Sequence, residues 1–123
     1  MKCLRVYADE NGESHFSEME IGMSESQPLP GRTMSAPAAA ANIQFLTVSG
    51  KLYTDWHPAP ARQFVISLDK TIEIETSDGQ RRKVQPPSVV FVEDTWGKGH
   101  KTRSLDDHAG TVIFVPLAGD APR

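Results

Sequence analysis

The sequence has little of what marks several large classes of protein. It contains one cysteine, Cys3, so no disulfide can form within the chain. No apolar run approaches the roughly 20 residues that a membrane-crossing helix needs. The N-terminal residues carry charges at Lys2 and Arg5 and lack the apolar stretch of a signal peptide. These absences predict a cytoplasmic protein that does not associate with a membrane.

Neither sign of charge dominates the chain. It has 13 Lys and Arg residues against 16 Asp and Glu residues, a net charge of -3, which gives no electrostatic reason to expect nucleic acid as a partner. The basic run at residues 81–83 follows a turn and is interpreted as a solvated strand flank. With 123 residues, the chain is expected to form a single domain, residues 1–123, with its own apolar core.

Helical periodicity is nearly absent, and short strand patterns take its place. They cover residues 3–8, 15–21, 43–48, 53–57, 63–68, 71–76, 81–84, 88–92, 97–103 and 111–115. In the clearest of them, Ile72 and Ile74 alternate with glutamates, as in a strand with one buried face. Many short strands joined by Gly, Pro and Asp turns predict an antiparallel sandwich or barrel, with two packed sheets that enclose a cup for a small ligand.

Residues 24–42 differ from the rest, because they contain three prolines and a run of alanines and show no periodicity. This segment is interpreted as a loop or arm between the N-terminal strands, residues 1–23, and the main body, residues 43–117. A structureless segment of this length inside a compact domain is often functional. We expect either a lid over the cup or a clasp around a second subunit.

Two segments carry the strongest indications of a site, residues 55–63 and residues 93–100. Each contains one histidine, His57 or His100, among groups with little reason to lie together unless they line a pocket. An unbroken series of strand patterns separates the two segments. The histidines are therefore expected on strands of one sheet system, facing each other across its interior.

These two segments resemble the two sequence motifs of the cupin family. The first motif has two histidines, a carboxylate and a later glycine; His57 stands at the first histidine, and the other positions hold Ala59, Gln63 and Lys70. The second motif ends in a glycine, two residues and a histidine, as residues 97–100 do. The resemblance covers most of the chain after residue 42. It implies an all-β fold, an antiparallel double-stranded β-helix or jelly-roll barrel, of the small single-domain kind.

The resemblance also implies a divalent metal ion, Zn, Fe, Mn or Ni, with His57, Gln63 and His100 as its ligands. Such metals take three or four protein donors, and imidazole and carboxylate are preferred to amide. Ala59 has no donor atom, and Gln63 offers only a neutral amide oxygen. Metal binding and metal-free chemistry therefore both stay open.

Metal-free chemistry would use His57, Glu93 and His100 as catalytic groups. An imidazole beside a carboxylate in a half-dry cup can act as a general acid or base near neutral pH. We expect Glu93 to pair with one of the two histidines. Asp94, the next residue, is interpreted as part of a polar turn.

Further residues of the two segments are candidates for binding a ligand: Trp56, Arg62, Gln63 and Lys98. Trp56 could form one wall of the pocket. Arg62 and Lys98 could receive a carboxylate or a phosphate of the substrate. The histidine at position 15 is interpreted as a hydrogen-bonded structural residue.

Three functions are compatible with this set of residues. The first is an enzyme that acts on a small molecule in the cup, by isomerisation, epimerisation or oxygenation. The second is a ligand-binding module without turnover, and the third is a mainly structural protein. A homodimer is expected in all three cases, because small β-barrels with exposed edge strands often pair.

Overall fold

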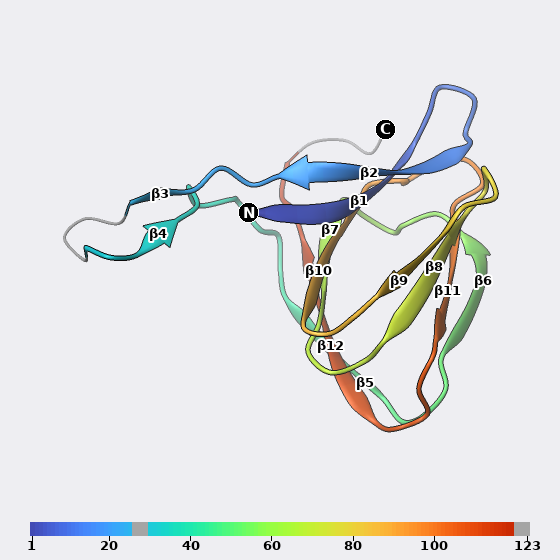
Figure 1. Cartoon of the computed structure of the whole chain (residues 1–123). Coiled ribbons are helices and arrows are strands. Elements are labelled where there is room, and N and C mark those ends of the chain that lie inside the picture. The colour runs from blue at the N-terminus through green and yellow to red at the C-terminus, as the bar shows by residue number, and fades with distance from the viewer. Residues whose placement is uncertain (26–29, 120–123) are drawn as a thin grey trace.

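The computed structural model describes residues 1–25 and 30–119, and within these ranges the chain forms strands and turns but no helix (Figure 1). A helix that could cross a membrane is consequently not found among the described residues. The fold is all-β and is built from several sheets whose strands are mostly antiparallel. The predicted fold class is confirmed at this level.

The larger sheet has six strands. Their order is β2 (Ser14–Glu20), β1 (Lys2–Ala8), β10 (Ser88–Val92), β7 (Gln63–Ser67), β12 (Gly110–Pro116) and β5 (Gln44–Val48). β1 and β10 run parallel, and the remaining neighbours are antiparallel. β2 and β5 are the edge strands.

The second sheet has four antiparallel strands. Their order is β6 (Tyr53–His57), β11 (His100–Ser104), β8 (Ile72–Thr76) and β9 (Arg81–Val84). A separate pair, β3 (Ser24–Glu25) and β4 (Thr33–Met34), forms a small hairpin that projects from the body (Figure 1). This hairpin lies within the predicted arm.

The two larger sheets face each other and share one apolar core. Val6, Val90 and Val92 contribute to it from the six-stranded sheet, and Ile72 and Ile74 from the four-stranded sheet. On β8 the isoleucines are buried while the intervening glutamates are half exposed, as the alternating pattern predicts. The expectation of two packed sheets is therefore confirmed.

Candidate functional site

A cavity of about 330 Å³ lies between the two sheets. Its walls are mainly hydrocarbon: Leu46, Leu52, Val65, Ile72, Ile74, Val90, Val92, Val112 and Phe114. Its polar lining consists of two hydroxyls, one amide and two imidazoles, from Thr54, Thr102, Gln63, His57 and His100. Apolar walls with a few convergent polar groups are the usual form of a small-molecule site.

Three of these polar side chains come from strand ends at the same end of the cavity. His57 is the last residue of β6, His100 is the first of β11, and Gln63 is the first of β7. His57 pairs directly with His100 across the antiparallel strands, and their ring centroids lie 5.1 Å apart with the planes inclined by 46°. The predicted convergence of the two histidines is confirmed.

A β-bulge brings His57 to the cavity side of β6. Thr54 also lines the cavity, and in a regular strand a residue three positions later would point to the opposite face. Between the pairs His57–His100 and Thr54–Thr102, however, β6 advances three residues while β11 advances two. The extra residue reverses the alternation, so both Thr54 and His57 face inward.

The hydrogen bond of His57 fixes the tautomer of its neutral ring. Its Nδ1 lies 2.8 Å from the backbone oxygen of Asp55. A carbonyl oxygen can only accept, so Nδ1 carries the hydrogen and donates it. The Nε2 atom is then left with a lone pair for a ligand or a proton.

His100 is held by a carboxylate. Its Nδ1 lies 2.6 Å from Oδ2 of Asp94, which is fully buried, while His100 itself is 6% exposed. A carboxylate at Nδ1 orients the ring and stabilises it when Nε2 takes up a proton. Asp94 and His100 therefore form a buried carboxylate–imidazole dyad.

The second oxygen of Asp94 is the unusual feature of this dyad. Oδ1 is buried and has no hydrogen-bond partner among residues 1–25 and 30–119. Leaving such an acceptor unpaired costs about 1–3 kcal/mol, and native proteins contain few examples. The hydrogen bond to His100 is therefore the side-chain contact that holds this carboxylate in place.

Glu93 does not occupy the position expected for it beside the histidines. Its carboxylate accepts hydrogen bonds from the Arg5 guanidinium and also lies 3.5 Å from Nε of Arg62. Val90 and Val92 line the cavity, so the period of two places residue 93 on the opposite face and residue 94 inward. That parity was the signal in the sequence that could have identified Asp94.

Three of the four predicted ligand-binding side chains lie away from the cavity lining. Trp56 is 41% exposed, with the Lys101 ammonium 5.2 Å from its ring. Arg62 pairs with Glu93, and Lys98 pairs with Glu13 at 3.0 Å. Of this group, the structure places only the amide of Gln63 in the cavity.

The glycines around Lys98 serve the packing of the chain itself. Gly99 has φ +75, and a Cβ atom there would overlap the backbone carbonyl of His57. Gly97, with φ +84, lies in the same way against the backbone of Gly12. The absence of a side chain at Gly99 therefore seats the start of β11 directly against the end of β6, and at Gly97 it lets the chain pass close to the turn between β1 and β2.

The cavity offers few donor atoms for a resident metal ion. Among the described residues no three His, Cys, Asp or Glu side chains are grouped so that they could hold an ion. His57 and His100 offer two imidazoles, and Gln63 adds an amide oxygen, a weak third donor. Ala59, at the position of the second motif histidine, is 3% exposed and packs in the core.

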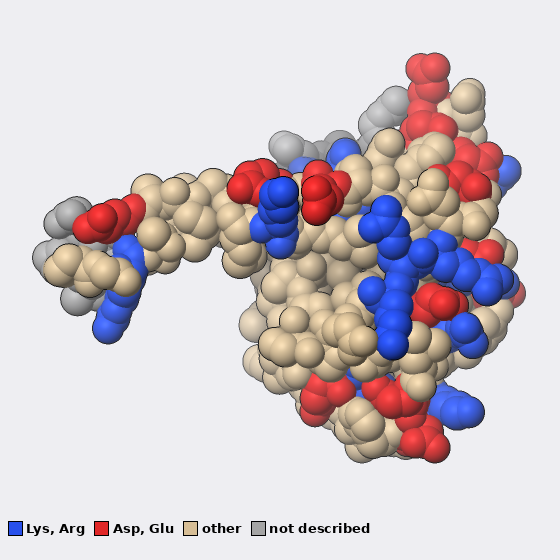
Figure 2. Space-filling model, in the orientation of Figure 1, with Lys and Arg blue, Asp and Glu red and all other residues tan. Residues whose placement is uncertain are grey.

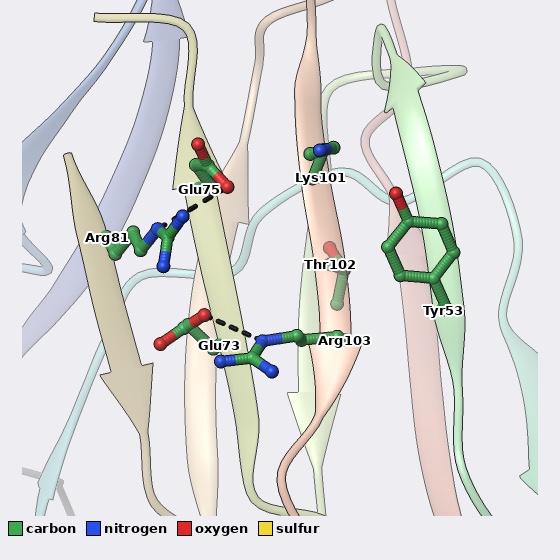
Figure 3. A pocket seen from close by; sticks show the side chains of 7 residues that line it. All are labelled: Tyr53, Glu73, Glu75, Arg81, Lys101, Thr102 and Arg103. Atoms are coloured by element: carbon green, nitrogen blue, oxygen red, sulfur yellow. Dashed lines mark hydrogen bonds and ion pairs between the residues drawn. The ribbon is translucent and has the colours of Figure 1, made fainter. Parts of the chain in front are cut away.

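A second hollow, of about 260 Å³, lies on the outer face of the four-stranded sheet, where side chains of alternating charge face solvent (Figure 3). Nε of Arg103 donates to Glu73 at 2.8 Å, and Nε of Arg81 lies 3.5 Å from Glu75. The hydrogen bond from Arg103 lowers the pKa of Glu73. These charges compensate one another across neighbouring strands, and none of the four histidines lines this hollow.

Comparisons with known proteins add little to this geometry. No family model matches the chain, and no curated protein matches it. Among solved structures, protein NMB1881 from Neisseria meningitidis is similar, with a TM-score of 0.44 and 10% sequence identity over 67% of this chain and 84% of that chain. A likeness at this level carries no argument about function.

Proposed function

We propose that the protein is an enzyme that transfers protons to and from a small molecule bound in the cavity between the sheets. The observation that supports this proposal is the buried Asp94–His100 dyad beside His57 at the polar end of an apolar cavity. Isomerisation and epimerisation are the reactions of this class. Both need one group that removes a proton and one that returns it.

In this proposal His100 is the general base. Its Nε2 accepts a proton from a carbon or an oxygen of the substrate, and the charged ring is stabilised by Asp94 through the bond at Nδ1. The apolar walls exclude water, which strengthens this interaction. The chain therefore needs no further charged group to hold the proton at Nε2.

His57 is the second proton carrier. Its Nδ1 donates to the Asp55 carbonyl, so the same Nε2 atom gives up or takes the proton that is exchanged. Because the ring centroids are 5.1 Å apart, one small substrate can contact both imidazoles. Delivery requires that His57 carry a proton at Nε2 when the substrate binds: His100 then removes one proton from the substrate, His57 delivers another at a second position, and exchange with water restores both rings.

A cupin-like jelly roll is the architecture that we propose for this function. Two sheets that face each other around a cavity, with His57 and His100 at its polar end, support it. In this family such a cavity also serves metal-assisted catalysis. If a metal is bound, His57, Gln63 and His100 would hold it, and its chemistry would be the polarisation of a substrate oxygen.

Deuterium exchange tests the proposed reaction even while the natural substrate is unidentified. A panel of small aldehydes and ketones is incubated with the protein in heavy water, and deuterium uptake next to the carbonyl carbon is measured by mass spectrometry. We expect Asp94→Asn, which keeps shape but removes charge, to lower exchange by about 10²–10⁴-fold. His108→Gln is the matched control, because His108 is an exposed histidine outside the cavity.

The proposal is contradicted if the wild-type protein exchanges deuterium no faster than the double variant His57→Gln/His100→Gln with every compound of the panel. Loss of exchange on chelation, with recovery on adding back one metal, would identify the metal-assisted form. A compound that raises the Tm and is recovered unchanged, without deuterium, would identify the ligand-binding module.

A further inference from the structure

The polar side chains of the cavity lining are histidines, threonines and a glutamine. Of the residues that line it, none is Lys, Arg, Asp or Glu within the described part of the chain. We infer that the substrate of the proposed reaction is an uncharged molecule with a hydrocarbon body and one oxygen-bearing group, such as a cyclic ketone, an aldehyde or a lactone. This inference deepens the proposed function and rests on it.

The cations near the cavity are already compensated. Arg62 pairs with Glu93, and Lys98 pairs with Glu13. Lys70 is 1% exposed, and its Nζ donates to the backbone oxygens of Gly50 and His108 and forms an ion pair with Asp106. A carboxylate or phosphate in the cavity would therefore have to compete with these carboxylates for each of the three cations.

The carboxylate nearest to the cavity disfavours an anion further. Asp94 is buried and bonded to Nδ1 of His100, and its Oδ1 atom has no hydrogen-bond partner in the described part of the chain. A second negative charge would be repelled in a medium of low dielectric constant and would also lose its hydration. A neutral ligand meets no such repulsion and has no charged group to dehydrate. It gains the free energy of burying its hydrocarbon surface.

The distribution of polar groups indicates how such a molecule would lie. His57, Gln63 and His100 are at one end of the cavity, and Ile72, Val90 and Val112 are among the hydrocarbon walls. A carbonyl oxygen can accept a hydrogen bond from the Gln63 amide, while the neighbouring C–H faces an imidazole. The volume of about 330 Å³ is near the lower end for ligand sites, which are about 300–1,000 Å³, so the body is small.

Three probes with the same ring test the charge preference: cyclohexanone, cyclohexanecarboxylate and cyclohexylammonium. Their dissociation constants for the wild-type protein are measured by NMR of the Ile and Val methyl groups, at the same pH for all three probes. We expect cyclohexanone to bind at least about tenfold more tightly than either ion. Binding of either ion as tightly as the ketone, or no detectable binding of the ketone, overturns the inference.

A variant inverts the preference if the inference holds. Thr54 lines the cavity from the edge strand β6, so Thr54→Lys introduces a cation there, and Thr54→Gln is the uncharged control. We expect Thr54→Lys to bind the carboxylate at least about tenfold more tightly than Thr54→Gln does. Equal affinities in the two folded variants count against the inference, and the comparison of the three probes stands even if Thr54→Lys does not fold.

Failure of this inference can be distinguished from failure of the proposed function. Selective binding of cyclohexanone without deuterium uptake would retain the ligand class and reject catalysis. Deuterium uptake by the wild-type protein together with tight binding of the carboxylate would retain catalysis and reject the ligand class.

Discussion

At the scale of single residues, Gly99 determines how closely the two histidine-bearing strands approach. It has a positive φ, and a Cβ would overlap the carbonyl of His57. We expect Gly99→Ala to lower the free energy of unfolding by about 2 kcal/mol or more, because an unfavourable backbone conformation and a steric overlap add. Urea denaturation with an unchanged m value would measure this loss.

Two other glycines separate the causes of this loss. Gly79 has φ +90 but open space around it, so Gly79→Ala reports the backbone conformation alone. Gly22 lies outside the left-handed region of φ, and no atom of the described residues lies close to the place of a Cβ there. Gly22→Ala should therefore change the free energy of unfolding by no more than about 0.5 kcal/mol. A cost at Gly99 that does not exceed the cost at Gly79 would refute the overlap.

Residue-level prediction of the site from the sequence was right for position and wrong for pairing. His57, His100 and Gln63 line the cavity, as expected from the two segments. The expected partner of the histidines, Glu93, faces the other way, and Asp94 takes its place. The period of two along β10 contains this information, whereas the bulge that turns His57 inward depends on pairing with β11 and leaves no local signal.

At the scale of elements, strand positions could be predicted well because each strand is short, alternating or β-branched, and bounded by turn residues. The strand expected at residues 97–103 begins only at His100, since Gly97 and Gly99 have positive φ values that a strand does not contain. The hairpin of β3 and β4 was missed, because two-residue strands are too short to show a period. The parallel pairing of β1 with β10 was also unforeseen, since it is a non-local contact.

His15 links strand β2 to two turns through contacts with two aspartates. His15 on β2 lies 2.7 Å from Asp9 in the turn before it and 3.0 Å from Asp78 in the turn between β8 and β9. The bond to Asp9 raises the pKa of His15, the bond to Asp78 adds to this, and partial burial opposes both. The pKa of Asp9 is lowered mainly by the same bond to His15. The interpretation of His15 as a hydrogen-bonded residue is confirmed.

This contact should make stability depend on pH. A raised histidine pKa contributes stability that is complete below the unfolded value of about 6.5 and is lost as the pH rises through the folded value. A lowered aspartate pKa contributes stability that is present above about 3.9 and is lost as the pH falls through the folded value. The contact of His15 with Asp9 is therefore strongest between about pH 4 and 6.5.

We expect the Tm difference between the wild-type protein and His15→Gln to be largest near pH 5.5 and to shrink above about pH 6.5. Differential scanning calorimetry of both proteins over this range measures it. A difference that stays constant up to about pH 8.5 would show that the contact does not titrate in this range.

At the scale of the whole molecule, the least explained feature is the arm. The described residues from Gly22 to Thr47, namely 22–25 and 30–47, are all exposed, and the hairpin projects beyond the body (Figure 1). Figure 2 shows that much of this projection is covered by uncharged residues, with charges gathered near its tip. Apolar side chains are exposed along this stretch of chain at Met23, Met34 and Ile43, and at Phe45 on the edge strand β5 that follows it in the sequence.

An arm with exposed apolar side chains and an exposed edge strand are surfaces that a second copy of the chain could cover. We therefore expect the full chain to be a homodimer and a chain without residues 24–42 to be a monomer, as measured by light scattering. Phe45 is 71% exposed on β5, so Phe45→Glu should raise the dissociation constant of the dimer at least about tenfold. Leu68→Glu is the matched control, since Leu68 is 49% exposed but lies outside the arm and β5. If the shortened chain has the same dimeric mass as the full chain, the arm is not the clasp, and its exposure calls for a different partner.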